Sequence, residues 1–476
     1  MPPANRRAGD GSRRYNLSMF KNYISKLKNI NRIWLLPIVL VLAVIIYFIP
    51  PVHDRLAWRI NDVRTAVVYF FNPPDQAIFV PAQQNQQNAI ATVVQSTMRA
   101  YSTQQASLAT MTPAASSSTS SGPTPTPSPT STPLPATVSL PGVKYENQFN
   151  RWNYCGPANF SMALTFWGWT GNRDVIGKAV MPGNTGSDGL PANRDKNVMP
   201  YEFQDFISAN VPDMTSLLRY GGDIDVLKRL IAGGFPVVAE KGYYEKDYTG
   251  KLSWMGHYQF ITGYNDNDKT LLVQDTYLDG PNFKVSYDTF MTGWRSFDYI
   301  FVVVYPTNRD ADVKSLLGPY ADETWATKHA LETATAESQS LSGIDQFFAW
   351  FNIGTSHVDL LEYADAASAY DQAFQLYANL NVDNTTRPYR MMWYQTGPYK
   401  AYFYSQRYQD VINLANTTLN NTIAEPVLEE SLYWRGYAED YIGQTQAAID
   451  DFRAALKIHP KWDPALQALA TLGVKP

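Results

Sequence analysis

The feature that most limits how this chain can fold is a tract, residues 112–135, in which 20 of 24 residues are Ser, Thr or Pro. No charged residue occurs between Arg99 and Lys144. Such a composition cannot build a hydrophobic core, so we expect a disordered, extended linker here. A chain of 476 residues with 45% hydrophobic content is otherwise long enough for two or three domains. The tract therefore predicts that the folded domains lie beyond it.

The N-terminal part contains an uncharged apolar run of 20 residues, Ile33 to Val52. A run of this length predicts a transmembrane helix. Residues 1–32 carry a net charge of +7, which places the N-terminus in the cytoplasm by the positive-inside rule. A cleaved signal peptide is the alternative, but no small-residue cleavage site follows the run. We therefore expect a single-pass membrane protein whose C-terminal domains are extracytoplasmic.

The charge balance bears on the partners. The whole chain has a net charge of −4, so the part that follows the basic segment is net acidic. No second basic run follows, which argues against nucleic acid as a partner. Residues 53–74 place apolar side chains at helical spacing with arginines between them, as in an amphipathic helix on the membrane surface or a plain stalk helix.

The C-terminal part, from about Trp325 onward, is helical in pattern and contains internal repeats. Segments 363–380 and 445–460 share a small, an aromatic and a small residue at the same spacing, and a looser third copy spans 393–419. The shared positions are Ala366, Tyr370 and Ala373, matched by Ala448, Phe452 and Ala455, each set preceded by a glycine, Gly354 or Gly436. This pattern resembles the tetratricopeptide repeat, which implies paired antiparallel helices and a surface for a protein or peptide partner.

The single cysteine of the chain, Cys155, lies in the stretch RWNYCGPANFSMALTFWGW. A lone extracytoplasmic cysteine cannot form a disulfide within its own chain. Pro157 suits a first helical turn and an apolar face follows it, so we expect Cys155 at the N-terminal end of a buried helix. Backbone N–H groups and the helix dipole favour the thiolate at that position. An inert buried thiol is the alternative.

Of the five histidines, only His257 lies in the same predicted domain as Cys155. It begins the run HYQFITGY, which the polar turn NDND joins to TLLVQD, a pattern that predicts a β-hairpin. If the turn centres on Asp266, His257 and Asp275 face each other across the strands. A thiol, an imidazole and a carboxylate so placed are typical of a nucleophilic triad. No cysteine pair or histidine-rich spacing indicates a metal site, and we expect no cofactor.

The stretches NQFNRWNYCGPANFSMAL and GHYQFITGYNDNDKTLLVQDTYLDGP together resemble the papain-like cysteine peptidases related to bacteriocin-leader processing enzymes, the C-39-type group. The resemblance covers about 165 residues and implies an α+β papain-like fold. It also implies roles for four residues: Cys155 as nucleophile, His257 as general base and then acid, Asp275 as orienting residue, and Gln148 as oxyanion donor.

We therefore predict an α+β papain-like cysteine peptidase domain followed by an all-α tetratricopeptide-type helical repeat domain, with one N-terminal transmembrane helix. The predicted function is hydrolysis of amide bonds in a peptide or protein substrate. A catalytically silent adaptor, and an acyl transferase or transglutaminase-like enzyme, are the alternatives. The predicted parts are a cytoplasmic basic segment 1–32, a membrane anchor 33–52, a partly helical juxtamembrane segment 53–101, a disordered linker 102–139, the peptidase domain 140–307, a connecting helical segment 308–345 and the repeats 346–476.

Overall fold

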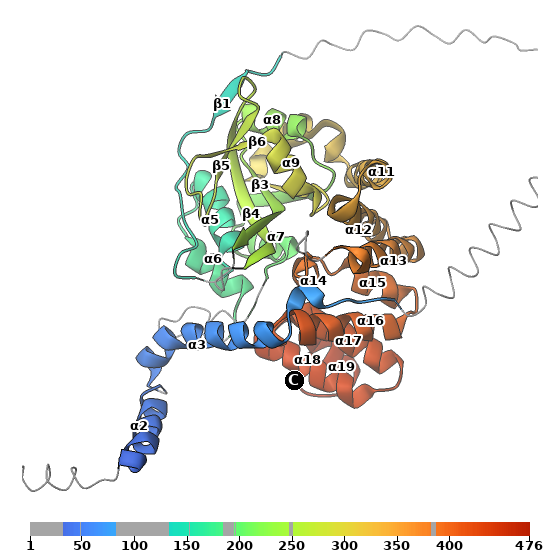
Figure 1. The fold of residues 1–476 in the computed structure, drawn as a ribbon. Coiled ribbons are helices and arrows are strands. Elements are labelled where there is room, and N and C mark those ends of the chain that lie inside the picture. Colours follow the sequence, from blue (N-terminus) through green and yellow to red (C-terminus); the bar gives the residue numbers. More distant parts are fainter. Residues whose placement is uncertain are drawn as a thin grey trace, which may run out of the picture. The chain divides into compact units, whose positions relative to one another are not determined.

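The computed structural model describes the chain in several stretches (Figure 1). The described residues are 32–47, 49–81, 133–151, 153–183, 195, 197–246, 251–381 and 387–476. Nearly all of the predicted basic segment and most of the predicted linker lie outside the described residues. The chain divides into two units, residues 1–61 and residues 62–476.

The predicted transmembrane segment is divided between two helices, α2 (Arg32–Tyr47) and α3 (Pro50–Phe71). Pro50 and Pro51 begin α3, because proline lacks a backbone N–H and suits a first helical turn. The 16 residues of α2 rise about 24 Å, short of the roughly 30 Å of a hydrocarbon core. Within the described stretches no helix is both long and apolar enough to span a bilayer, so the predicted transmembrane helix is wrong. The extracytoplasmic location stays a prediction.

The second unit contains a seven-stranded antiparallel sheet in the order β2-β7-β3-β4-β5-β6, with β1 paired to β4 beside this path. β1 lies within the predicted linker, whose last residues therefore join the sheet. The strands are β1 Thr137–Ser139, β2 Met214–Arg219, β3 Val237–Lys246, β4 Leu252–Asn265, β5 Thr270–Gln274, β6 Phe283–Ser286 and β7 Phe301–Pro306.

Helices cover both faces of this sheet, because the central strands are apolar on both sides. Val237 and Ala239 face one buried cluster, and Val238 between them faces the other. The first cluster contains residues of α8 Ile224–Ala232, α9 Tyr287–Arg295 and α10 Asp310–Leu317. The second contains residues of α5 Cys155–Phe166, α6 Arg173–Val180 and α7 Pro200–Asn210. Strands buried on both faces have nearly continuous apolar runs, as β7 does with FVVVYP.

The C-terminal region is helical, as the sequence predicts. In two of the aligned segments, a glycine of the preceding helix faces the aromatic ring of the segment. A Cβ added to Gly354 would lie 2.6 Å from the ring of Tyr370, and a Cβ added to Gly436 would lie 2.9 Å from the ring of Phe452. The assignment to the tetratricopeptide family stays a prediction. The helices are α11 Glu323–Ser340, α12 Gly343–Asp359, α13 Tyr363–Asn379, α14 Met391–Tyr394, α15 Gly397–Tyr404, α16 Tyr408–Thr417, α17 Glu429–Tyr441, α18 Thr445–Ile458 and α19 Asp463–Thr471.

The segment that follows α3 packs on this helical region. Phe79 is 4% exposed, and its ring lies edge-on to Phe374 with 5.0 Å between the centroids. The backbone carbonyl of Asp75 accepts a hydrogen bond of 3.0 Å from Arg387. The Asp75 carboxylate also pairs with Lys251 at 2.8 Å. These contacts attach residues 75–79 to the folded unit.

Replacing Phe79 with alanine should destabilise the chain by about 3–5 kcal/mol, because it leaves a cavity beside Phe374. Phe70 is the matched control, since it precedes the same segment and is 79% exposed. Thermal unfolding of the two variants should show a clear loss of Tm for Phe79→Ala and almost none for Phe70→Ala. Equal Tm values would mean that residues 75–79 do not pack on the helical region in solution.

Candidate active site

Cys155 is the first residue of α5, directly after the N-cap Tyr154. The second residue of the helix, Gly156, lies against the ring of Phe203, since a Cβ added there would lie 2.5 Å from that ring. Only glycine therefore fits next to the thiol without displacing that ring. Asn159, fully buried, donates hydrogen bonds of 2.8 Å to the carbonyls of Cys155 and Tyr258. This side chain ties the helix start to β4 at the residue next to His257.

The thiol of Cys155 is half-buried and not part of a disulfide. Burial favours the neutral thiol, but the hydrogen bond and charge of His257, together with the backbone N–H groups of Tyr258 and Gly156, outweigh it and lower the Cys155 pKa. The thiolate is the nucleophilic form of cysteine. The lowered pKa favours a reactive sulfur over the alternative of an inert buried thiol.

His257 lies on β4 and is 4% exposed. Its Nε2 atom lies 3.0 Å from Oδ2 of Asp275, which leaves Nδ1 as the ring nitrogen for its hydrogen bond with Cys155. Burial opposes protonation of the ring, but Asp275 and then Cys155 favour it and raise the His257 pKa to about 10. Between the lowered pKa of Cys155 and a pH of about 10, the imidazolium and the thiolate form an ion pair.

Asp275 follows the last residue of β5 and is 4% exposed. Its Oδ2 atom accepts a second hydrogen bond, of 2.9 Å, from Gln259, and Oδ1 accepts one of 2.8 Å from the backbone N–H of Tyr277. Burial raises the Asp275 pKa, but the charge of His257 and these hydrogen bonds prevail and hold the pKa below its ordinary value. Asp275 is thus a charged acceptor fixed from three sides.

The predicted hairpin register is wrong by two residues. β4 and β5 pair Phe260 with Gln274, and continuing this pairing places Gln259, not His257, opposite Asp275. The sequence predicts a tight turn centred on Asp266, but the strand pair that brackets the turn is Asn265 with Thr270. The register also shifts at a bulge between Ile261 and Gly263. Because side chains alternate with period two, a slip of two residues keeps His257 and Asp275 on the same face.

Gln148 lies beside the residue that follows Asp275. Its backbone N–H donates to the carbonyl of Thr276 at 2.8 Å, and its Oε1 accepts from the Thr276 hydroxyl at 2.9 Å. Its side chain makes no hydrogen bond to Cys155, His257 or Asp275. The structure therefore brings Cys155, His257 and Asp275 into one connected group, with Gln148 at its edge.

Sequence reasoning missed two groups that hold this arrangement. Gln259 lies two residues after His257 on the same strand face, so period-two alternation was a sufficient signal for it. Glu240 lies in the apolar run FPVVAE, and burial, with the charge of Cys155, raises its pKa well above the ordinary value. This shift favours the neutral acid, which adds no negative charge beside the thiolate.

The alkylation rate of Cys155 with iodoacetamide, followed against pH, tests the ion pair. The thiolate should form below the ordinary cysteine pKa of about 8.5. In His257→Ala, burial remains while the hydrogen bond and charge are lost, so the titration should move to higher pH. His357→Ala, a substitution in the helical region, is the control and should titrate like the wild type. Identical curves for wild type and His257→Ala would contradict the pair.

Comparison with known proteins gives a family match for part of the chain. Residues 141–300 match the model of the Peptidase C39 like family. No curated protein matches the chain. A crystal structure described as a C39-like peptidase from Bacillus anthracis is 16% identical, with a TM-score of 0.28, over 36% of this chain and 97% of the other. Xylellain, a cysteine protease from Xylella fastidiosa, is 16% identical, with a TM-score of 0.26, over 37% of this chain and 87% of its own. Residues 141–300 are thus a domain of the Peptidase C39 like family.

Proposed function

We propose that this chain is a cysteine peptidase that hydrolyses amide bonds with Cys155 as nucleophile, His257 as acid and base, and Asp275 as the residue that orients His257. The observation that carries the proposal is the buried imidazole of His257, which contacts the thiol of Cys155 through one nitrogen and lies 3.0 Å from Asp275 through the other. Cys155 as a whole residue is partly exposed.

The reaction proceeds in two halves. The Cys155 thiolate attacks the carbonyl carbon, the C–N bond breaks, and the His257 imidazolium gives its proton to the leaving amine. A water molecule then attacks the thioester, and His257, now neutral, takes a proton from it. The C–S bond breaks, the carboxylic acid leaves, and the thiolate–imidazolium pair is restored.

The oxyanion of each tetrahedral intermediate needs a donor, and we assign Gln148 to this role on the resemblance to the C-39-type group. The hydrogen bond from Thr276 engages Oε1 of Gln148, so the Nε2 amide is the end of the side chain able to donate. A positioned donor of this kind lowers the activation barrier by about 2.7–4 kcal/mol in comparable sites. We further propose that the helical region binds a protein or peptide partner.

Profiling of the full chain on a peptide library, with Cys155→Ala as the control, tests the function. We expect cleavage products from the wild type alone and covalent labelling of Cys155 by thiol-reactive peptide probes. Transfer of the acyl group to an added amine, in preference to water, would instead indicate an acyl transferase. An intact library together with an unlabelled thiol would indicate a silent binding domain and sink the proposal.

Substitutions at Asp275 should have graded effects. Asparagine has only one side-chain oxygen, so it can accept from His257 or from the N–H of Tyr277, but its NH₂ group faces the other donor. Asp275→Asn should therefore lower kcat/KM about tenfold, roughly 1.4 kcal/mol. Alanine leaves the imidazole unheld and should cost on the order of a hundredfold or more. Cys155→Ala and His257→Ala should fall to background. Full activity of Asp275→Ala in steady-state assays would remove Asp275 from the mechanism.

Two buried glutamines of the hairpin allow a matched comparison. Gln259 donates to Asp275, whereas Gln274 donates to Thr262 and Asn282 outside the site. Leucine at either position removes buried hydrogen bonds and should lower Tm. Only Gln259→Leu should also lower kcat, by about tenfold, a loss of roughly 1.4 kcal/mol, because Asp275 loses one of its fixing partners. If the two variants have equal kcat, Gln259 has a structural role alone.

A further inference from the structure

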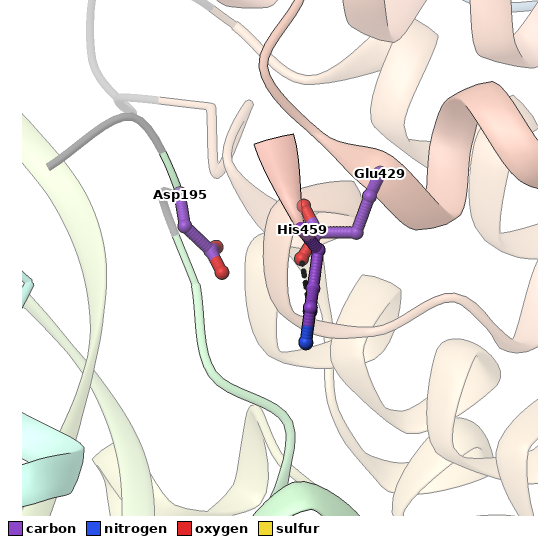
Figure 2. Close-up of side chains that lie close together, drawn as sticks. All are labelled: Asp195, Glu429 and His459. Atoms are coloured by element: carbon purple, nitrogen blue, oxygen red, sulfur yellow. Dashed lines mark ion pairs between the residues drawn. The ribbon is translucent and has the colours of Figure 1, made fainter. Parts of the chain in front are cut away.

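A buried group of acidic side chains lies where the segment before α7 meets the starts and ends of two C-terminal helices. Asp195 precedes α7, Glu429 is the first residue of α17, and His459 directly follows α18. One ligand atom from each lies within 4.8 Å of the other two. Figure 2 shows the carboxylate of Asp195 turned toward Glu429 and His459.

Several polar atoms of this group have no hydrogen-bond partner in the described part of the chain. They are both carboxylate oxygens of Glu429, Oδ2 of Asp195 and Nδ1 of His459. Glu429 is 1% exposed and Asp195 2%. Buried polar atoms are almost always hydrogen-bonded, and leaving one unsatisfied costs about 1–3 kcal/mol, more for a charged group. Four such atoms in one place indicate a missing partner.

Among the residues that the structure describes, the charge of the group is also unbalanced. Glu202 and Glu430 are buried beside the other two carboxylates. Across the described ranges, no lysine or arginine lies within ion-pair distance of these four acids; the one basic group is His459, 3.6 Å from Glu429 and 3.7 Å from Glu202. One imidazolium cannot neutralise four buried carboxylates, and uncompensated buried charge is costly.

Protons alone account less well for the group than a cation does. Protonation reduces the charge and turns a carboxylate into an O–H donor, but among the described residues no hydrogen-bond partner reaches either oxygen of Glu429. A metal ion neutralises charge and occupies the orphaned oxygens and nitrogen at once.

We propose that Asp195, Glu429 and His459 bind one divalent transition-metal ion, with Zn²⁺ as the preferred species. Two carboxylates and one imidazole suit Zn²⁺ or Mn²⁺, whereas Ca²⁺ and Mg²⁺ prefer oxygen ligands throughout. Ligand atoms bind Zn²⁺ at about 2.0–2.2 Å, so movements of up to about 1 Å would close the three side chains around one ion. Glu202 and Glu430 supply the surrounding negative charge.

Such an ion would join the peptidase domain to the helical region at a point linked to the Cys155 helix. The carbonyl of Asp195 accepts a hydrogen bond of 3.1 Å from Asn153, two residues before Cys155. Glu202 immediately precedes Phe203, whose ring packs against Gly156. The ion would therefore have a structural role, distinct from the proposed hydrolysis.

The test uses the full chain with Cys155→Ala, so that the active-site thiolate cannot bind Zn²⁺. The protein is stripped with EDTA, dialysed against Zn²⁺, Mn²⁺ or Ca²⁺ alone, and its metal content and Tm are measured. We expect one Zn²⁺ per chain, weaker Mn²⁺ and little Ca²⁺, with a higher Tm in Zn²⁺. Glu429→Gln and His459→Ala should weaken Zn²⁺ binding at least about a hundredfold. His357→Ala, in the exposed group His357, Glu362 and Asp365, is the control and should retain the ion.

Glu429→Gln gives a second readout with opposite signs. In EDTA it should raise Tm, because it removes one buried negative charge, whereas in Zn²⁺ it should remove the gain that the ion gives the parent protein. Absence of bound metal in the parent protein would overturn the proposal, as would Ca²⁺ binding that survives His459→Ala. A Glu429→Gln variant that keeps its Zn²⁺ would overturn the assigned ligands.

Discussion

The pairing of β4 with its neighbours is the constraint on which the site depends. β4 carries His257 and Gln259, and it pairs with β3 on one side and with β5, which leads to Asp275, on the other. Asn159 then fixes the start of α5 to the carbonyl of Tyr258 on the same strand. The thiol, the imidazole and the carboxylate therefore come from three segments that a single strand holds together. Local changes in that strand would move all three at once.

Two buried acidic sites of the chain differ in how their negative charge is balanced. The recorded hydrogen bonds to the carboxylate of Asp275 come from His257, Gln259 and the N–H of Tyr277. Around Glu429 the neighbours are other acids and a single histidine. A carboxylate in the first setting stays charged inside the protein without outside help. In the second it needs a counter-charge that the described side chains do not provide.

Much of the site was predictable because its signals are local. Pro157 and the apolar face after it predict where α5 begins, and alternation along β4 predicts that His257 and Asp275 share a face. The register was not predictable, since it depends on the length of the turn after Asn265 and on a bulge near Gly263, neither of which has a fixed residue signature. The two-residue error was harmless only because it is an even number.

Other features failed or escaped for different physical reasons. Hydropathy alone predicts one long helix for the apolar run from Ile33, but Pro50 and Pro51 start a new helix and divide the run in two. The acidic group was not predicted, because Asp195 lies more than 200 residues before Glu429 and His459 in the sequence. No spacing in the sequence connects the three residues. Only packing of the helical region on the segment before α7 places them together.

The attachment of residues 75–79 changes what the Ser/Thr/Pro-rich stretch does for the chain. Phe79 packs in the helical region and Val138 pairs with Tyr264 on β4, so both flanks of residues 82–132 are fixed to the same folded unit. Doubling the length of a flexible loop between two such fixed ends costs only about 0.6 kcal/mol in closure entropy. Insertions and deletions there are nearly neutral for stability. A single proteolytic nick would cut the chain and still leave both fragments held together by packing.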